Sequence, residues 1–326
     1  MHAGKTRKLM TNLLSAKPQT QHWPRFFIVL LLLFLSGCSK DDDLRTVDFG
    51  KTIPVARPGE KPSDRPFLRV TVGATISPKE TFVYYRQLLD YLANNLDREI
   101  QLVQRKTYRE VNELIGKDQI DLAFICSGPY VSGKEQYGIE LLATPEVHGS
   151  HFYHSYLIVN KESQFQSLED LRGRVFAFTD PDSLTGKLVP TFWLAEMHER
   201  PETFFAKVIY TYSHDNSILA VARGLVDGAA VDGLVWEYYQ HENPSRTSGT
   251  RVIKKSESFG IPPVVVSKAL PLELKERIQQ LLLSMHDGAA GEKILRELMI
   301  DRFLAPQEEW YDTVRQVERT LSIGME

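Results

Sequence analysis

The sequence predicts an α/β protein with two folded parts. Short strand-like segments alternate with segments of helical periodicity from residue 67 onward, which is typical of a mainly parallel sheet covered by helices. The 326 residues exceed one ordinary domain, so two domains are expected. A glycine, an aspartate and a short apolar strand follow one another at residues 116–123 and again at 224–229. No fixed period continues this pattern, so we expect one β-α-β arrangement used in each half and no solenoid repeat.

The composition is that of a globular protein. Hydrophobic residues make up 42% of the chain and charged residues 25%, which excludes global disorder, a collagen and a multi-span membrane protein. The 39 basic and 42 acidic residues give a net charge of −3, which is no sign of a nucleic-acid binder. Two cysteines are too few for a disulfide-rich scaffold or a four-cysteine zinc site.

Residues 1–37 are expected to be a signal peptide. Residues 1–25 carry basic residues and no acidic one, and residues 26–35 are an apolar run. This run has about half of the roughly 20 residues that a spanning helix needs, but it suits a secretory signal. Translation starting at Met10 is an alternative, because the basic segment before the apolar run is long.

A lipid anchor is expected directly after this signal. The segment Leu35-Ser36-Gly37-Cys38 resembles a bacterial lipobox, in which the cysteine is lipidated and becomes the mature N-terminus. An ordinary signal with a chance cysteine is the alternative. Residues 38–66 hold recurring prolines and few apolar residues, which predicts an extended linker. We therefore expect a periplasmic or otherwise extracytoplasmic protein held at the membrane through Cys38. Residues 1–37 contain five basic residues and no acid, so the mature chain has a net charge of −8.

The folded part divides into two series of strands and helices. In the first series we expect strands at 68–74, 100–103 and 121–125, helices at 81–96 and 108–115, and a turn at 127–130 that leads into another helix. In the second we expect strands at 156–159, 175–178, 208–212, 228–231, 251–253 and 264–266, and helices ending at 194 and covering 216–223 and 236–239. The chain from residue 271 onward is expected to be helical.

The loop at residues 180–187 is the most informative candidate site. It follows a strand, opens a helix, and carries Ser183 and Thr185 as hydroxyl donors. Gly186 allows a close approach of the backbone, and the first amides of a helix lack internal acceptors, so the loop suits a tetrahedral oxyanion. A plain helix N-cap is the alternative. The loop is not a P-loop, because the G-x-x-x-x-G-K-[ST] pattern is absent.

Two further loops occupy the same kind of position. His214 follows the strand at 208–212 and could donate to an anion or titrate near neutrality, and a surface histidine is the alternative. Asp215 or Asn216 could cap the helix that follows. Asp232 comes just after the strand at 228–231. Ligands of open α/β sheets bind outside the carboxyl ends of the strands, where all three loops lie.

Other motifs favour packing over chemistry. His148, His151 and His154 precede a strand, in which His151 points away from the other two, so no metal site is expected. Cys126 could be a nucleophile, but a buried cysteine is the commoner case. No G-x-S-x-G or H-E-x-x-H motif is present, so no enzyme and no cofactor are expected. Trp236, Tyr238 and Tyr239 are expected to be packing residues.

Four motifs in order resemble those of a known family. The chain over residues 67–320 resembles the periplasmic phosphate, phosphite and phosphonate-binding proteins of ABC transporters. The motifs are Gln119-Ile120-Asp121-Leu122-Ala123-Phe124, Asp180-Pro181-Asp182-Ser183-Leu184-Thr185-Gly186 with Val189-Pro190, Ser213-His214-Asp215-Asn216 with Ala220-Val221-Ala222, and Val226-Asp227-Gly228-Ala229-Ala230-Val231-Asp232.

This resemblance implies a two-lobed periplasmic binding protein of type II, in which two strands cross between the lobes and the ligand lies in a central cleft. It implies a first lobe at 67–155, completed by 260–326, and a second lobe at 156–259. The anion would be held by the helix N-terminus and by His214, with two aromatic residues and a polar group of the second lobe. The residues implied are Tyr108, Tyr153, Ser183, Leu184, Thr185, Gly186, His214 and Asp232.

The loop departs from the family in two places. Leu184 stands where the family usually has Thr or Asn, so one hydroxyl is lost and only the amide of Leu184 remains; Thr185 stands where a second Ser is usual. The acidic group that binds the amine of aminophosphonates has no clear match, so an aminophosphonate is not expected. The turn at 125–130 resembles a divergent branch, whose members could bind another ligand or serve a sensor.

The expected function is capture of phosphate, phosphite or a phosphonate for an ABC permease, by a monomeric lipoprotein that closes its lobes without covalent chemistry. The alternatives are a ligand-sensing subunit of a membrane signalling protein, with the same fold, and a secreted enzyme acting on phosphate esters.

Overall fold

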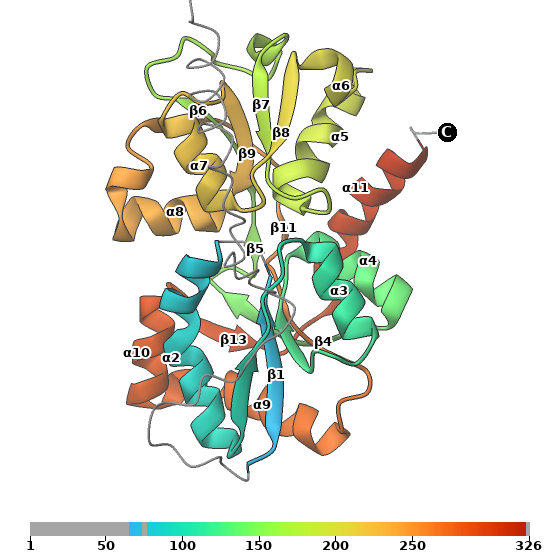
Figure 1. Ribbon diagram of the computed structural model, residues 1–326, viewed down its shortest axis with the longest axis vertical. Helices are drawn as coiled ribbons and strands as arrows, with labels where there is room; N and C mark the ends of the chain where they lie inside the picture. Colours follow the sequence, from blue (N-terminus) through green and yellow to red (C-terminus); the bar gives the residue numbers. More distant parts are fainter. Residues whose placement is uncertain (1–64, 74–76, 324–326) are drawn as a thin grey trace, which may run out of the picture. The chain divides into compact units, whose positions relative to one another are not determined.

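The computed structural model describes residues 65–73 and 77–323. The expected signal peptide, Cys38 and all but the last two residues of the linker lie outside these residues. No helix among the described residues is long and apolar enough to cross a membrane. The described chain forms two α/β lobes, each built on its own sheet, and most of their helices and several of their strands are labelled in Figure 1.

The first lobe is built on a six-stranded sheet with the order β13-β4-β12-β3-β1-β2. Only β1 with β2 and β1 with β3 are parallel; the pairs that involve β12 and β13 are antiparallel. Its strands are β1 (Phe67–Val72), β2 (Glu99–Leu102), β3 (Leu122–Phe124), β4 (Glu140–Glu146), β12 (Val264–Val266) and β13 (Arg302–Leu304). Its helices are α2 (Pro78–Leu96), α3 (Tyr108–Gly116), α4 (Ser127–Tyr137), α9 (Leu272–Leu283) and α10 (Ala289–Glu297), with the 3₁₀ turn η4 (Met285–Asp287).

Local sequence explains how these helices start and stop. Helix α2 begins with a proline, ends at the left-handed residue Asp97 (φ 52°), and buries Leu88 and Leu92 against the sheet. Helix α3 begins with a capping box between Thr107 and Glu110. The residues expected to form a turn at 127–130 are the first turn of α4, where a proline is tolerated because the amides there have no helical acceptor.

The second lobe is built on a five-stranded sheet with the order β10-β6-β9-β7-β8, in which β7 is parallel to β8 and β9. Its strands are β6 (Ser155–Asn160), β7 (Val175–Phe178), β8 (Lys207–Tyr210), β9 (Gly228–Asp232) and β10 (Thr250–Lys255). Its helices are the π-helical turn η2 (Leu184–Leu188), α5 (Val189–Glu196), α6 (Pro201–Phe204), α7 (His214–Ala222) and α8 (Gly233–Glu242), with the 3₁₀ turns η1 (Glu169–Leu171) and η3 (Pro244–Arg246).

Two short strands join the lobes. Strand β5 (Phe152–Tyr153) leads into the second lobe, β11 (Phe259–Gly260) leads back, and the two pair antiparallel. This arrangement confirms the expected crossing of two strands. It also explains why the expectation of mainly parallel sheets is wrong. Strands β12 and β13 join the first sheet after the chain has returned from the second lobe, and they run antiparallel to their neighbours. Strand β13 also interrupts the stretch expected to be helical, and β4 was not expected from the sequence.

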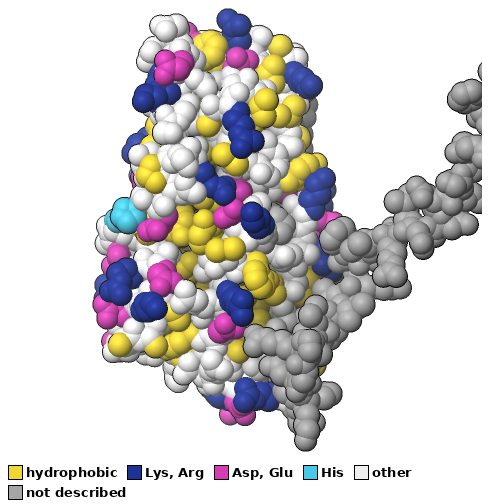
Figure 2. Space-filling model, turned by 60° about the vertical axis from the view of Figure 1, so that its left-hand side comes forward, with side chains coloured by type: hydrophobic (Ala, Val, Ile, Leu, Met, Phe, Trp, Pro, Cys, Tyr) yellow, Lys and Arg dark blue, Asp and Glu magenta, His cyan; other side chains and the backbone are white. Residues whose placement is uncertain are grey.

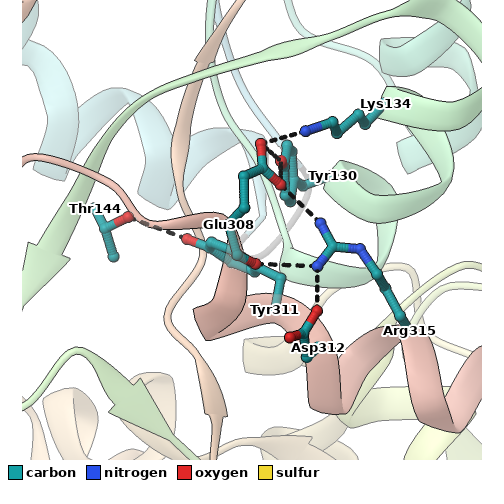
Figure 3. Close-up of polar contacts among 7 residues, drawn as sticks. All are labelled: Tyr130, Lys134, Thr144, Glu308, Tyr311, Asp312 and Arg315. Atoms are coloured by element: carbon teal, nitrogen blue, oxygen red, sulfur yellow. Dashed lines mark hydrogen bonds and ion pairs between the residues drawn. The ribbon is translucent and has the colours of Figure 1, made fainter.

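The C-terminal helix α11 (Asp312–Ile323) contacts both lobes. It packs on α4 of the first lobe and on η2 and α5 of the second. The turn before it, η5 (Glu308–Tyr311), is fixed to the first lobe (Figure 3): the Tyr130 hydroxyl donates to Glu308 at 2.8 Å, and the Tyr311 hydroxyl is hydrogen-bonded to Thr144 at 3.1 Å. Arg315 pairs with Glu308 at 2.7 Å. The base of α11 is therefore held by the first lobe while its side lies against the second.

Candidate functional site

Three strand-to-helix loops of the second lobe meet at one edge of its sheet. Strands β8, β7 and β9 are parallel neighbours, so the loops that follow them lie at the same edge. The amide of Tyr212, after β8, donates to the carbonyl of Thr179, after β7, at 2.7 Å. The amide of Asp232, at the end of β9, donates to Nδ1 of His214 at 2.9 Å. The structure thus brings the three loops together.

The loop after β7 has the geometry of a helix N-terminus. Ser183 is the N-cap of η2, and its hydroxyl accepts the Gly186 amide at 3.1 Å. The Thr185 carbonyl accepts from Ser155 at 2.7 Å. A Cβ on Gly186 would lie 1.8 Å from Oγ1 of Thr179, so the close approach expected of this glycine is required. Ser183 therefore caps this helical turn, as the alternative predicted, but the cap occupies only the Ser183 side chain of the loop.

Several hydroxyl and imidazole groups around these loops are buried without a hydrogen-bond partner. Among the described residues, no partner reaches Oγ1 of Thr179, Oγ1 of Thr185, Oγ of Ser213 or Nε2 of His214. Leaving such a group buried and unpaired costs about 1–3 kcal/mol. Four such groups in adjoining loops are available to hydrogen-bond a bound molecule.

His214 can only be a donor at Nε2. Its Nδ1 accepts an amide hydrogen, so a neutral ring carries its proton on Nε2. Burial lowers the pKa of His214 to about 3, so the ring stays neutral at physiological pH. The suggestion that His214 titrates near neutrality, like the suggestion of a surface histidine, is wrong, because the side chain is fully buried. His214 would therefore contribute one hydrogen-bond donor, the Nε2–H group, to anion binding.

Asp232 caps α8 and is buried. One carboxylate oxygen accepts the amides of Leu234 at 2.8 Å and Val235 at 3.3 Å. Burial raises the pKa of Asp232 to about 7, against which these two hydrogen bonds act. Asp232 is therefore partly protonated near neutral pH, and its protonated form repels an anion less than its ionised form does.

Replacing Asp232 with asparagine is expected to raise the melting temperature at pH 8 and to change it little at pH 4. The unfolded chain ionises Asp232 near its ordinary pKa of about 3.9, whereas the folded chain holds the proton to about pH 7, so wild-type stability falls as pH rises through this window. Asparagine removes that cost and keeps an oxygen for the cap. Thermal unfolding of both proteins from pH 4 to pH 8 measures the difference. A melting difference that is the same at every pH would contradict the assignment.

The first lobe covers the loops with α3 and α4. The Tyr108 amide donates to Asp180 at 3.2 Å, and Arg109 pairs with Asp182 at 3.0 Å. Burial raises the pKa of Asp180 to about 6. A Cβ on Gly128, in the first turn of α4, would lie 3.1 Å from the Asp182 carbonyl oxygen and 3.3 Å from the Leu184 nitrogen. The lobes are thus in a closed arrangement at this point.

A second set of contacts between the lobes lies at the start of α2. The Ser77 amide donates to Asp215 at 2.9 Å, and Arg246 pairs with Glu80 at 2.6 Å. Ser213, not Asp215, is the N-cap of α7, so the suggestion that Asp215 or Asn216 caps this helix is wrong. No local sequence pattern indicates these contacts, because their partners lie 138 and 166 residues apart.

Cys126 lies where the first lobe meets the loop after β7. The Tyr153 hydroxyl lies 4.0 Å from its sulfur, and a Cβ on Gly128, two residues further on, would lie 3.3 Å from the Leu184 nitrogen of that loop. Burial raises the pKa of Cys126 to about 11 and that of Tyr153 well above its usual range. A protonated, enclosed thiol is a poor nucleophile, which disfavours the enzyme alternative.

The structure places the expected site residues in two groups. One group adjoins the unpartnered donors or contains them: Ser183, Thr185, Gly186, His214 and Asp232. Tyr153 and Leu184 meet at Cys126, and Tyr108 reaches the loop through its amide. All eight side chains or backbone positions are buried. Among the described residues there is no cluster of three or more His, Cys, Asp or Glu that could hold a metal ion.

The chain is similar in sequence to several known proteins. A family model described as "ABC transporter, phosphonate, periplasmic substrate-binding protein" matches residues 70–311. The phosphate-import protein PhnD of Mycolicibacterium smegmatis is 26% identical over 267 residues, which are 77% of either chain. The phosphonates-binding periplasmic protein of Escherichia coli is 27% identical over 173 residues, and that match spans only 51% of its length.

Solved structures show the same two-lobed fold. The binding protein component of a phosphonate ABC transporter from Pseudomonas aeruginosa superposes with a TM-score of 0.74 at 24% identity, over 80% of this chain and 89% of that one. The PhnD1 protein of Prochlorococcus marinus, in complex with methylphosphonate, gives a TM-score of 0.71 at 20% identity, over 78% and 98%. The expected type II fold is confirmed.

Proposed function

The chain belongs to the family of periplasmic substrate-binding proteins of phosphonate ABC transporters, and from this membership we propose that it captures a small phosphorus oxyanion: phosphate, phosphite or a phosphonate. Proteins of this family bind solutes and are extracytoplasmic. The observation that carries the ligand proposal is the set of buried donors without acceptors at Thr185, Ser213 and His214. An oxyanion supplies several acceptor oxygens to donors that converge from different loops.

The anion has to be attracted by hydrogen-bond donors in the site and not by the net charge of the protein. With residues 1–37 removed, the chain has a net charge of −8, so its overall field repels an anion. The site offers a helix N-terminus, hydroxyl groups and the neutral imidazole of His214. Hydrogen bonds from neutral donors in a dry site also provide selectivity, because a ligand that leaves one of them unpaired is penalised.

Binding would close the lobes without any covalent step. The contacts of Asp180 and Asp182 with α3, and of Asp215 and Arg246 with the start of α2, join the lobes only when they are closed. The crossing strands β5 and β11 would act as the hinge. In this proposal a ligand stabilises the closed arrangement by pairing the buried donors.

We also propose a location for the folded body. Cys38 would carry the lipid, residues 38–66 would be the tether, and a monomer would deliver its ligand to an ABC permease in the same membrane. A basic signal, a short apolar run and the lipobox-like segment Leu35–Cys38 support this.

Calorimetry with a panel of oxyanions tests the ligand class. Full-length protein in detergent is titrated with phosphate, phosphite, methylphosphonate, sulfate and acetate. We expect micromolar or tighter binding of at least one phosphorus oxyanion and none of acetate, because a planar carboxylate has too few oxygens for these donors. Absence of binding to every phosphorus and sulfur oxyanion would reject the ligand and leave the fold unaffected.

A further inference from the structure

An apolar cavity lies between the lobes beside the proposed anion site. It has a volume of about 160 Å³ and is lined from α2 and β3 of the first lobe, from α8 of the second, and from the chain before β13. Helices α2, α8 and α10 lie on the side that is turned forward in Figure 2, where apolar side chains gather at mid-height between acidic and basic ones. Representative lining residues are Tyr85, Phe124, Val235, Tyr238, Ile261 and Met299.

The walls of this cavity suit an uncharged group. Tyr84 and Tyr238, from opposite lobes, meet edge to face at 5.1 Å, and Tyr85 packs in the same way on Phe124 at 5.5 Å. No lysine or arginine is among the described residues that line the cavity, while Asp232 and Glu237 are. His148 is the one basic side chain among the described lining residues, so a phosphorus oxyanion would find neither a lysine nor an arginine here. The Glu237 carboxylate is engaged by the Tyr156 hydroxyl.

The cavity and the unpartnered donors share a wall. Asp232 lines the cavity, and its amide holds the imidazole of His214, whose Nε2 is unpartnered among the described residues. Ile125 lines the cavity and directly precedes Cys126, the N-cap of α4, whose first turn approaches the Leu184 nitrogen. A ligand with its oxyanion on these donors would therefore have room for a substituent on the cavity side of Asp232.

We propose that the ligand is a tetrahedral phosphorus oxyanion that bears a compact apolar substituent, about the size of a phenyl ring, and that this substituent fills the cavity. This inference rests on the proposed function. Apolar cavities of about 150 Å³ accept benzene, which sets the size. Burying an apolar group of the size of a phenylalanine side chain gives about 10- to 150-fold in affinity. The phenyl compound should therefore bind about 10- to 100-fold more tightly than the methyl compound.

The test compares ligands that share the head group. Full-length protein is titrated calorimetrically with inorganic phosphate, methylphosphonate, propylphosphonate, phenylphosphonate, phenyl phosphate and 2-aminoethylphosphonate. We expect affinity to rise from methyl to propyl to phenyl and the aminoethyl compound to bind no better than methylphosphonate. Comparing the affinities for phenyl phosphate and phenylphosphonate shows whether the site prefers a phosphate ester or a phosphonate.

A pair of variants tests whether the gain in affinity from methyl to phenyl depends on this cavity. Val235→Trp fills it from α8, and Leu225→Trp adds the same side chain at a site that is 69% exposed. We expect Val235→Trp to abolish the preference for phenyl and to keep the affinity for phosphate or methylphosphonate, and Leu225→Trp to change neither. A wild-type protein that binds methyl and phenyl compounds equally overturns this inference alone, and so does a preference that survives Val235→Trp. A protein that binds none of the compounds overturns the proposed function as well.

Discussion

Replacing His214 with alanine is expected to raise the dissociation constant for the phosphorus oxyanion by roughly 10- to 150-fold. The Nε2–H group of His214 is buried and has no partner among the described residues, so an anion would receive a full hydrogen bond from it. A hydrogen bond to a charged group contributes about 1.5–3 kcal/mol, from which this factor follows. Calorimetry on wild type and variant measures the change.

Two conservative variants separate binding from structure. Asparagine at position 214 places an acceptor near the Nδ1 position, so it can still hold the Asp232 amide, but it has no donor at Nε2. Glutamine places a donor near Nε2 and loses the acceptor at Nδ1. We expect His214→Asn to keep the melting temperature and lose affinity, and His214→Gln to keep more of the affinity at a lower melting temperature. The reverse pattern would make His214 a structural residue only.

Valine at position 128 is expected to weaken ligand binding by about 10- to 100-fold while the free protein stays folded. A single Cβ at Gly128 would already lie 3.1 Å from the Asp182 carbonyl and 3.3 Å from the Leu184 nitrogen, both on the other lobe. Overfilling a packed contact costs about 1–3 kcal/mol, and here the cost falls on the closed arrangement alone. An open protein accommodates valine in the first turn of α4.

The matched control for this variant is Gly288→Val. No atom lies within 4 Å of a Cβ built on Gly288, so the same substitution meets no neighbour there. Calorimetry gives the affinities, and small-angle scattering with saturating ligand reports whether the lobes close. Unchanged affinity and normal closure in Gly128→Val would show that closure does not need this approach. A fall in the melting temperature of the ligand-free protein would place the damage in α4 itself.

The sequence predicts local elements well where periodicity is strong. Strand β7 begins and ends as expected at Val175 and Phe178, and α3 is expected to within one residue. The resemblance supplied the two-lobed fold with its two crossing strands. The antiparallel pairs of the first sheet were missed because they depend on the direction in which β12 and β13 return, which no local pattern encodes. Strand β13 has three residues and pairs only with β4, so its sequence carries little signal.

The site was predictable in its residues but not in its chemistry. Residue types and strand-end positions pointed to Ser183, Thr185 and His214. Burial keeps the His214 ring neutral, and the amide of Asp232, 18 residues away, fixes the tautomer that places its proton on Nε2. Tyr238 packs as expected, edge to face on Tyr84 of α2, and it also lines the cavity; no local pattern shows this, because Tyr84 lies 154 residues earlier in the chain. Contacts between the lobes can be inferred only once the tertiary fold is known.

The enclosure of Cys126 gives the protein a native probe of its own opening. Among the described residues Cys126 is the only cysteine, it is buried, and it is the N-cap of α4, whose first turn approaches the Leu184 nitrogen of the opposite lobe. A lipidated Cys38 would have its sulfur in a thioether and would not react. A thiol reagent in solution therefore reaches one sulfur, and only in molecules whose lobes have parted. The labelling rate reports how often the lobes separate, just as hydrogen exchange reports local unfolding, and no introduced dye is needed.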